Sequence, residues 1–77
     1  MKDLLLFIVQ SLVDDPKSVN ITEINDSEDS VTFEIRVAES DMGKVIGKQG
    51  RIAKAIRSIM RSAANKEHKK VTVDIKD

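Results

Sequence analysis

The chain has 77 residues, of which 40% are hydrophobic and 34% are charged, and it contains no cysteine. This length suits one small domain, and the lack of cysteine excludes disulfides and thiolate metal sites. Residues 1–40 hold three bases and nine acids, a net charge of −6, whereas residues 41–77 hold ten bases and four acids, a net charge of +6. This asymmetry indicates either a polyanion-binding surface in the second half or a solvated helix beside an acidic hairpin.

The longest fully apolar run, at residues 4–9, is far shorter than the ~18 residues that a membrane span needs. No basic leader or small-residue cleavage site accompanies this run. We therefore expect a cytoplasmic protein that has no membrane partner.

Residues 3–13 are predicted to form a helix that ends before Pro16, because proline disfavours helical geometry in the residue before it. The apolar stripe of this helix is wider than one buried face needs. The side chains that widen it, Leu4, Leu6 and Phe7, have two interpretations. The simpler interpretation is that they cover a small core, and the alternative is that they form the surface of a dimer.

Residues 19–24 are predicted to form a strand whose imperfect alternation suggests a bulge. A polar hairpin loop follows at residues 25–30. Residues 31–37 alternate cleanly between apolar and polar side chains, which is typical of a strand with one buried face. A short helical turn is then expected at residues 41–46, with Ser40 as its cap.

The remaining elements are a helix at residues 51–64 and a closing strand at residues 71–75. The order is therefore α-β-β-α-α-β, an α+β fold with its helices packed on one face of a three-stranded sheet. Because a helix pair separates the second and third strands, these strands can run parallel, which makes the sheet mixed. We expect residues 1–77 to form this single domain.

The loop Gly47-Lys48-Gln49-Gly50 carries the clearest functional signal. Without a Cβ, either glycine can adopt a positive φ and let another backbone come close. The following helix begins with unpaired N–H groups and the positive end of its dipole, an arrangement that binds anions. Lys48 and Arg51 add positive charge to such a phosphate site. Two glycines three residues apart also occur in plain helix–helix turns, so the pattern alone leaves that alternative open.

The helix at residues 51–64 has two chemically distinct sides when its residues are projected at the helical period. One side is apolar and is expected to face the core: Ile52, Ile56, Ile59, Met60 and Ala63. The other side is basic and begins at the glycine loop: Arg51, Lys54, Arg57 and Arg61. Loop and basic side thus form one surface, whose positive field Lys44 extends. Because neither aromatic residue, Phe7 or Phe33, lies there, we expect bases to rest on aliphatic side chains rather than on aromatic platforms.

No catalytic motif is present. Gly43, Gly47 and Gly50 fit neither a Walker loop nor a dinucleotide-binding fingerprint. His68 has no cysteine partner, and the acidic hairpin lacks the spacing of a calcium loop. The sequence therefore predicts no enzyme, no metal and no cofactor.

The run VIGKQGRIAKAI at residues 45–56 resembles the signature of the KH domain, a nucleic-acid-binding module. In that family a Gly-x-x-Gly loop clamps about four nucleotides through their backbone. The element order is similar to the type II, prokaryotic arrangement, and the size resembles that of the small bacterial KhpA-type proteins. The resemblance covers nearly the whole chain.

The resemblance implies which residues bind nucleic acid. The loop residues would clamp phosphates, while Val45 and Ile46, with Ile52 or Ala53, would line a base groove. Many KH signatures place isoleucine where this chain has Ala53. The complete expected site comprises Lys44, Val45, Ile46, Gly47, Lys48, Gln49, Gly50, Arg51, Ile52 and Lys54.

The resemblance further implies a partner and a role. The ligand would be single-stranded RNA, and the protein would act as an RNA chaperone or post-transcriptional regulator. It would form a homodimer or a heterodimer with a KhpB-type KH protein, with a link to cell-envelope and cell-shape homeostasis. Two alternatives stay open: a dimerisation subunit that does not itself bind RNA, and a binder of single-stranded DNA.

Overall fold

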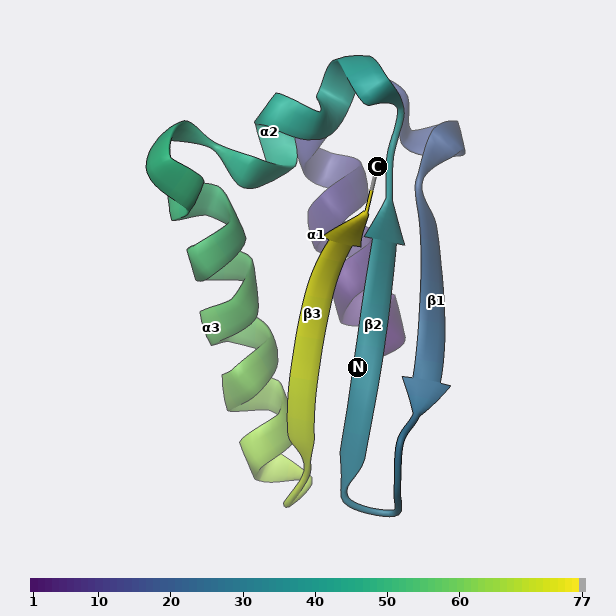
Figure 1. The fold of residues 1–77 in the computed structure, drawn as a ribbon, viewed down its shortest axis with the longest axis vertical. Helices are drawn as coiled ribbons and strands as arrows, with labels where there is room; N and C mark the ends of the chain where they lie inside the picture. The colour runs from purple at the N-terminus through teal and green to yellow at the C-terminus, as the bar shows by residue number, and fades with distance from the viewer. Residues whose placement is uncertain (77) are drawn as a thin grey trace.

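The computed structural model describes residues 1–76, in which three helices accompany a three-stranded sheet (Figure 1). The elements are α1 Lys2–Leu12, β1 Asn20–Asn25, β2 Ser30–Arg36, α2 Met42–Ile46, α3 Arg51–Lys66 and β3 Lys70–Lys76. Short 3-10 turns precede β1, α2 and α3. The predicted order is confirmed, and each helix and strand begins and ends within two residues of its predicted position.

The sheet has the strand order β1-β2-β3, with β1 antiparallel to β2 and β3 parallel to β2. The helix pair α2 and α3 connects the two parallel strands, so the predicted mixed sheet is confirmed. The antiparallel register runs without interruption along β1, so the suggested bulge is wrong. The imperfect alternation has another cause: Ile24 pairs with Thr32 on the face of the sheet that points away from the core, where Ile24 is exposed.

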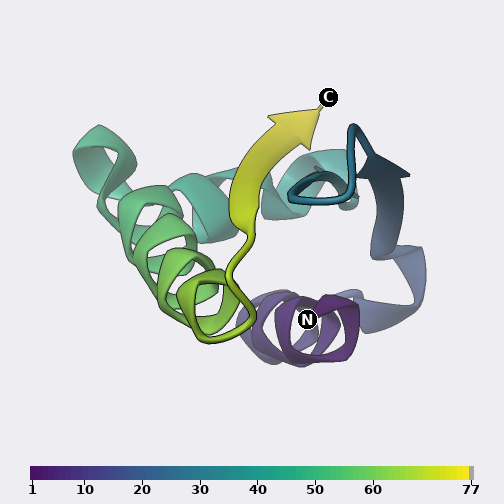
Figure 2. The ribbon, with the colours of Figure 1, turned by 90° about the horizontal axis from the view of Figure 1, so that it is seen from below.

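The helices α1 and α3 lie on the same side of the sheet, as the view from below shows (Figure 2). The core fills the space between them and the sheet. Its largest fully buried side chains include Phe33 of β2, Leu5 of α1 and Ile56 of α3. The opposite face of the sheet is polar, and there Glu34 pairs with Arg36 and Lys76 at 3.7 and 3.9 Å. The predicted packing of helices on one face is therefore confirmed.

The helix α3 is turned about its axis relative to the prediction. Ile59 was expected in the core but is 45% exposed, whereas Ala53 and Ala64 are buried. The helical projection of residues 51–64 took the large apolar side chains as the centre of the buried side. In the structure α3 packs through a side that includes small alanines, which let its backbone come near the sheet.

Two expectations, one about a helix cap and one about the residues that cover the core, are wrong in whole or in part. Phe7 is 69% exposed and Leu4 is exposed, so neither covers the core, whereas Leu6 is partly buried and packs against it. Leu5 and Val9 are the fully buried side chains of α1. Ser40 lies inside the 3-10 turn before α2 and caps nothing, because no side-chain cap bond is made at either start. Among residues 1–76, no helix has both the length and the apolar character to cross a membrane.

Candidate nucleic-acid interface

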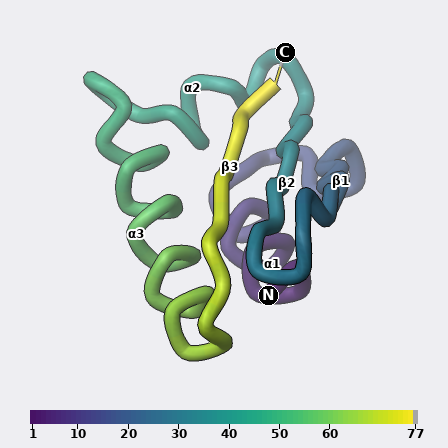
Figure 3. The backbone as a smooth tube through the Cα atoms, turned by 60° about the horizontal axis from the view of Figure 1, so that its bottom comes forward, coloured from purple at the N-terminus to yellow at the C-terminus, as the bar shows by residue number. Residues whose placement is uncertain are grey.

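The loop between α2 and α3 is a compact turn at an outer corner of the molecule (Figure 3). Gly47 and Gly50 adopt φ values of +73° and +72°, and Gln49 between them has a φ of +57°. The N–H of Gly50 donates to the carbonyl oxygen of Gly47 at 3.2 Å and closes the turn. Lys48 and Gln49 form its exposed tip. Both glycines thus have the backbone conformation that the sequence predicted for them.

The two glycines are required for different reasons. A Cβ at Gly47 would lie 2.7 Å from Cγ1 of Ile52, whose side chain covers the turn, whereas a Cβ at Gly50 would meet no atom within 4 Å. Gly47 therefore supplies both a backbone conformation and space, while Gly50 supplies the conformation alone. This close approach fixes the position of α2 relative to the first turn of α3.

Some backbone N–H groups of the loop donate hydrogen bonds within the protein, and others do not. The N–H of Gly50 closes the turn, and that of Arg51 donates to the carbonyl of Lys48. The N–H groups of Lys48 and Gln49 make no hydrogen bond to any part of residues 1–76. In the part of the chain that the structure describes, no side chain caps the start of α3. The tip thus presents free donors beside the positive end of a 16-residue helix.

The basic side of α3 runs from this tip along the helix. Arg51, Lys54, Arg57 and Arg61 are all exposed. Arg57 also does something that the sequence did not predict: its Nε donates to the carbonyl oxygen of Val73 at 3.1 Å. This bond crosses from α3 to β3, which is an edge strand of the sheet.

An open hollow of about 270 Å³ lies at this crossing between α3 and β3. Its lining comprises Arg57 and Arg61 from the helix and residues 71–74 from the strand. We call it the edge groove. Sequence reasoning placed the base groove only around the glycine loop and missed the edge groove. The sequence feature that could have revealed it is the helical connection between two parallel strands, which leaves β3 at the edge of the sheet beside α3.

Lys44 does not extend the positive surface as expected. Its Nζ pairs with the carboxylates of Asp14 and Asp41, the latter at 3.4 Å. The hydrogen bond with Asp14 is the main reason why the pKa of Lys44 lies above its ordinary value, against the opposing effect of burial. Lys44 therefore ties α2 to the segment after α1, and its charge is compensated by Asp41, three residues before it, and by Asp14, which is distant in sequence.

Asp41 is the buried partner in this tie, with only 1% of its surface exposed. Its Oδ1 accepts the N–H of Asp14 at 3.2 Å, and its Oδ2 accepts the N–H of Asp15 at 3.0 Å. Burial raises the pKa of Asp41, but these backbone donors and Lys44 outweigh it, so the pKa lies below its ordinary value. We call Asp41, Lys44 and the two N–H groups the aspartate clasp.

The apolar residues expected at the base groove separate into two groups. Val45 and Ala53 are buried in the core, so their side chains support the loop from below and cannot touch a ligand. Ile46 is exposed and Ile52 is partly buried over Gly47, so these two remain at the surface. The structure thus brings together the loop, Arg51, Lys54, Ile46 and Ile52. It buries the side chain of Val45 and leaves Lys44 exposed but paired with two carboxylates.

These features define a class of protein. An α-β-β-α-α-β order, a mixed three-stranded sheet and a Gly-x-x-Gly turn between its last two helices together constitute the type II KH fold. The predicted fold class is confirmed.

The chain belongs to the KhpA/KhpB KH-domain family, whose model matches residues 2–75. It is 55% identical over 75 residues to the RNA-binding protein KhpA of Clostridium perfringens, covering 97% of this chain and 99% of that protein. It is 56% identical over 75 residues to KhpA of Clostridium acetobutylicum, with the same coverage. KhpA of Listeria monocytogenes is 47% identical, covering 97% of each chain. No solved structure matches the chain significantly.

Proposed function

We propose that this protein binds single-stranded RNA and clamps its backbone with the glycine loop. The observation that carries the proposal is the tip of that loop, where the N–H groups of Lys48 and Gln49 are free. Phosphate oxygens accept hydrogen bonds from such amides. The cations of Lys48, Arg51 and Lys54 add attraction, because none of them is in an ion pair with another of residues 1–76. The relatives named above are RNA-binding proteins by name, which supports RNA as the ligand.

The bases would lie along α3 rather than on an aromatic platform. Phe33 is buried, and Phe7 is on α1. Ile46 and Ile52 offer aliphatic surface beside the loop, and the edge groove offers polar groups further along. A strand held by its phosphates at the loop can therefore place successive bases against α3 and the edge of β3.

The wider role is proposed from the family. We propose that the chain is a single domain, and a small protein with one such surface binds weakly on its own and gains avidity when sites are linked. We propose that it acts in the cytoplasm as an RNA chaperone or post-transcriptional regulator. A second KH protein of the KhpB type would supply the additional site, and the role in cell-envelope homeostasis would follow from the RNAs bound.

The test replaces the loop tip. In Lys48→Asp/Gln49→Asp the tip becomes acidic, and we expect the affinity for a fluorescein-labelled single-stranded RNA, measured by anisotropy, to fall at least about tenfold. Lys17→Asp/Asn20→Asp is the matched control, since both residues are exposed and distant from the loop and the charge change is the same. Unchanged binding by the loop variant would contradict the clamp. Tighter binding to DNA of the same sequence would favour the single-stranded DNA alternative.

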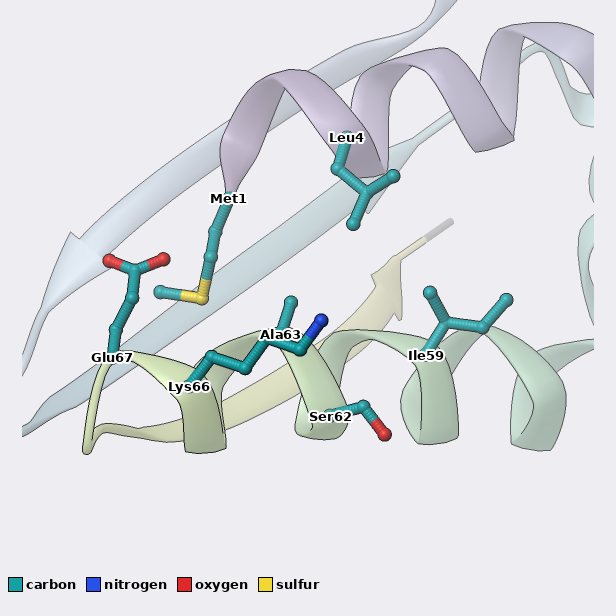
Figure 4. Close-up of a pocket in the computed structure, with 7 residues that line it drawn as sticks. All are labelled: Met1, Leu4, Ile59, Ser62, Ala63, Lys66 and Glu67. Atoms are coloured by element: carbon teal, nitrogen blue, oxygen red, sulfur yellow. The ribbon is translucent and has the colours of Figure 1, made fainter.

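A second candidate function, protein interaction, is favoured by an apolar surface on the helices. Leu4 and Ile59 are exposed, and between α1 and α3 lies a hollow of about 530 Å³ (Figure 4). Its lining includes two consecutive residues of opposite charge, Lys66 and Glu67, whose charged ends point in different directions. In a two-fold pairing, Lys66 of one copy can face Glu67 of the other, so the surface is self-complementary.

We therefore propose that the chain forms a homodimer through this surface. Sedimentation equilibrium should show a mass above that of the 8.6 kDa chain at high micromolar concentration. Leu4→Gln/Ile59→Gln should restore the monomer while leaving RNA binding by each chain in place. A wild-type protein that remains at 8.6 kDa would contradict the dimer and leave the RNA-binding proposal standing.

A further inference from the structure

The short helix α2 connects the aspartate clasp to the glycine loop. Asp41 lies immediately before α2, and Gly47 lies immediately after it. The N–H of Gly47 donates to the carbonyl oxygen of Gly43 at 2.9 Å, so helical hydrogen bonding continues into the first glycine of the loop. Figure 1 shows α2 across one end of the sheet, with the loop beyond it. The orientation of α2 therefore determines where the tip of the loop points.

The helix α2 is held at three places along its length. Its end is fixed by the close approach of Gly47 to Ile52, and Val45 anchors it in the core. These two contacts are apolar, and apolar contacts have little directional preference. The aspartate clasp holds the start of α2 by hydrogen bonds and ion pairs, which depend on direction. The clasp is therefore the contact that sets the orientation of this five-residue helix.

The clasp is a closed network around one carboxylate. Oδ1 of Asp41 accepts from the N–H of Asp14 at 3.2 Å and from Nζ of Lys44 at 3.4 Å, and Oδ2 accepts from the N–H of Asp15 at 3.0 Å. The carboxylate of Asp14 accepts from the same Nζ. The segment after α1 and the start of α2 are thus joined twice, and three donors on two oxygens fix the plane of the buried carboxylate.

Stability alone does not explain a carboxylate at this position. Taking a charge out of water is costly, and an apolar group of similar size often stabilises a fold equally well. Asp41 is only 1% exposed and precedes Gly47 by six residues, about 9 Å along a helical path, so it cannot reach a phosphate at the tip. Its directional bonds hold two distant segments in one arrangement, which an apolar group cannot do.

We infer that Asp41 is a positioning residue for RNA binding. Through Lys44 and the N–H groups of Asp14 and Asp15, it holds α2 in the orientation that presents the free N–H groups of the loop to phosphates. The inference rests on the proposed clamp and adds to it two acids, Asp14 and Asp41, that lie outside the expected site. Lys44 then contributes to RNA binding through its pairing with these acids and not through contact with a phosphate.

The test depends on the sign of the effect. Removing an acid from a protein that binds a polyanion ordinarily strengthens binding, because the net charge becomes more positive. Asp41→Asn should have the opposite effect, because its amide has one acceptor oxygen where the carboxylate has two. We expect the affinity for a fluorescein-labelled single-stranded RNA, measured by anisotropy at pH 7, to fall about tenfold. Glu39→Gln is the matched control, since it removes an exposed acid two residues earlier and should leave the affinity unchanged or raise it.

Two substitutions at exposed members of the clasp make the test independent of the buried one. The side chain of Asp14 is 82% exposed, and Asp14→Asn should also weaken binding although it removes an acid. Lys44→Gln should weaken binding without changing the log–log dependence of affinity on salt. A lysine that touched a phosphate directly would, when replaced, reduce the magnitude of that slope by about 0.7.

Circular dichroism and amide NMR spectra separate positioning from loss of fold. A purely structural role would lower the folded fraction and leave the affinity of the folded molecules unchanged. In the positioning role, the amide signals of Lys48 and Gln49 shift in folded Asp14→Asn and not in Glu39→Gln. Unchanged or higher affinity of folded Asp14→Asn, or a smaller salt slope in Lys44→Gln, overturns the inference and leaves the clamp standing. Absence of RNA binding by the wild-type protein overturns the proposed function together with the inference.

Discussion

At the scale of the residue, Gly47 carries the most demanding conformation in the chain. Its φ of +73° is combined with a ψ of 174°, a region that only glycine adopts without strain. Gly50 has a φ of +72° and a ψ of 18°, which is left-handed helical geometry that other residues can adopt at moderate cost. The two glycines look equivalent in the motif, but a non-glycine residue would have more conformational strain at Gly47 than at Gly50.

Alanine substitutions should separate these costs. We expect Gly47→Ala to lower the free energy of unfolding by about 3 kcal/mol, because strain adds to the contact with Ile52. Gly50→Ala should cost about 1 kcal/mol. The control is Gly43→Ala, which lies in α2 with open space around it and should be neutral or stabilising. Urea unfolding measures all three, and equal losses at Gly47 and Gly50 would show that the side chain of Ile52 moves aside freely.

At the scale of the element, the aspartate clasp joins parts of the chain that are far apart in sequence. Asp41 stands at the start of α2, and the N–H groups that it accepts belong to Asp14 and Asp15 after the end of α1. The short helix α2 has only five residues, too few to be stable by itself. Its position, and with it that of the glycine loop, depends on contacts of this kind.

The clasp predicts how stability responds to pH. Because the pKa of Asp41 is lowered in the folded state, its contribution is fully present above the ordinary value of 3.8 and is lost as the pH falls through the lower, folded value. Because the pKa of Lys44 is raised, its contribution is present below 10.5 and is lost as the pH rises beyond that value. Thermal melts should show that Asp41→Asn is less stable than wild type at pH 7 and that the difference disappears in strong acid. A difference that stays constant from pH 7 to pH 2 would rule out this linkage.

The basic side of α3 makes a second prediction at this scale. If Lys48, Arg51 and Lys54 neutralise three phosphates of a single strand, the log–log dependence of affinity on salt has a slope of roughly −2. Lys54→Gln should reduce the magnitude of this slope by about 0.7, whereas Lys17→Gln should leave it unchanged. Binding isotherms between 50 and 300 mM salt measure the slope. An equal change in both variants would mean that net charge, rather than a local contact, governs binding.

At the scale of the whole molecule, one shallow core holds the fold together. A chain of this size buries only about 60% of its unfolded surface, and here the helices cover a single face of the sheet. The two aromatic residues have opposite roles in this arrangement, since Phe33 is buried in the centre of the core and Phe7 is exposed on α1. Stability should therefore depend strongly on one and little on the other.

The two phenylalanines form a matched pair for testing this view. Phe33→Ala should remove about 3–5 kcal/mol, which is most of the stability of so small a chain, and leave the protein largely unfolded at 37 °C. Phe7→Ala should change the free energy of unfolding by no more than about 0.5 kcal/mol when measured at a concentration too low for association. Circular dichroism in urea reports both values. Similar losses in the two variants would mean that Phe7 packs more tightly than its exposure indicates.

Much of the fold and of the loop could be predicted from local pattern. The alternation in β2, the breaks at Pro16 and at the glycine loop, and the positive φ of both glycines depend on residues that are close in sequence. The residues whose surroundings were predicted wrongly are positioned by contacts with residues that are distant in sequence. Lys44 could not be assigned to a tie without knowing that Asp14 lies beside it, and Ile59 could not be placed outside the core without the rotation that the alanines of α3 permit.

The bond from Arg57 to Val73 has a consequence for the solubility of the protein. The outer edge of β3 presents backbone groups that pair with no strand of its own sheet, and such an edge is a template on which another chain can add a strand. The side chain of Arg57 already donates a hydrogen bond to one of these carbonyl oxygens. The charges of Lys70 and Lys76, at the two ends of β3, make it unfavourable for a similar strand to pair with this edge. Arg57 therefore lines the edge groove and also hinders aggregation through the open edge of β3.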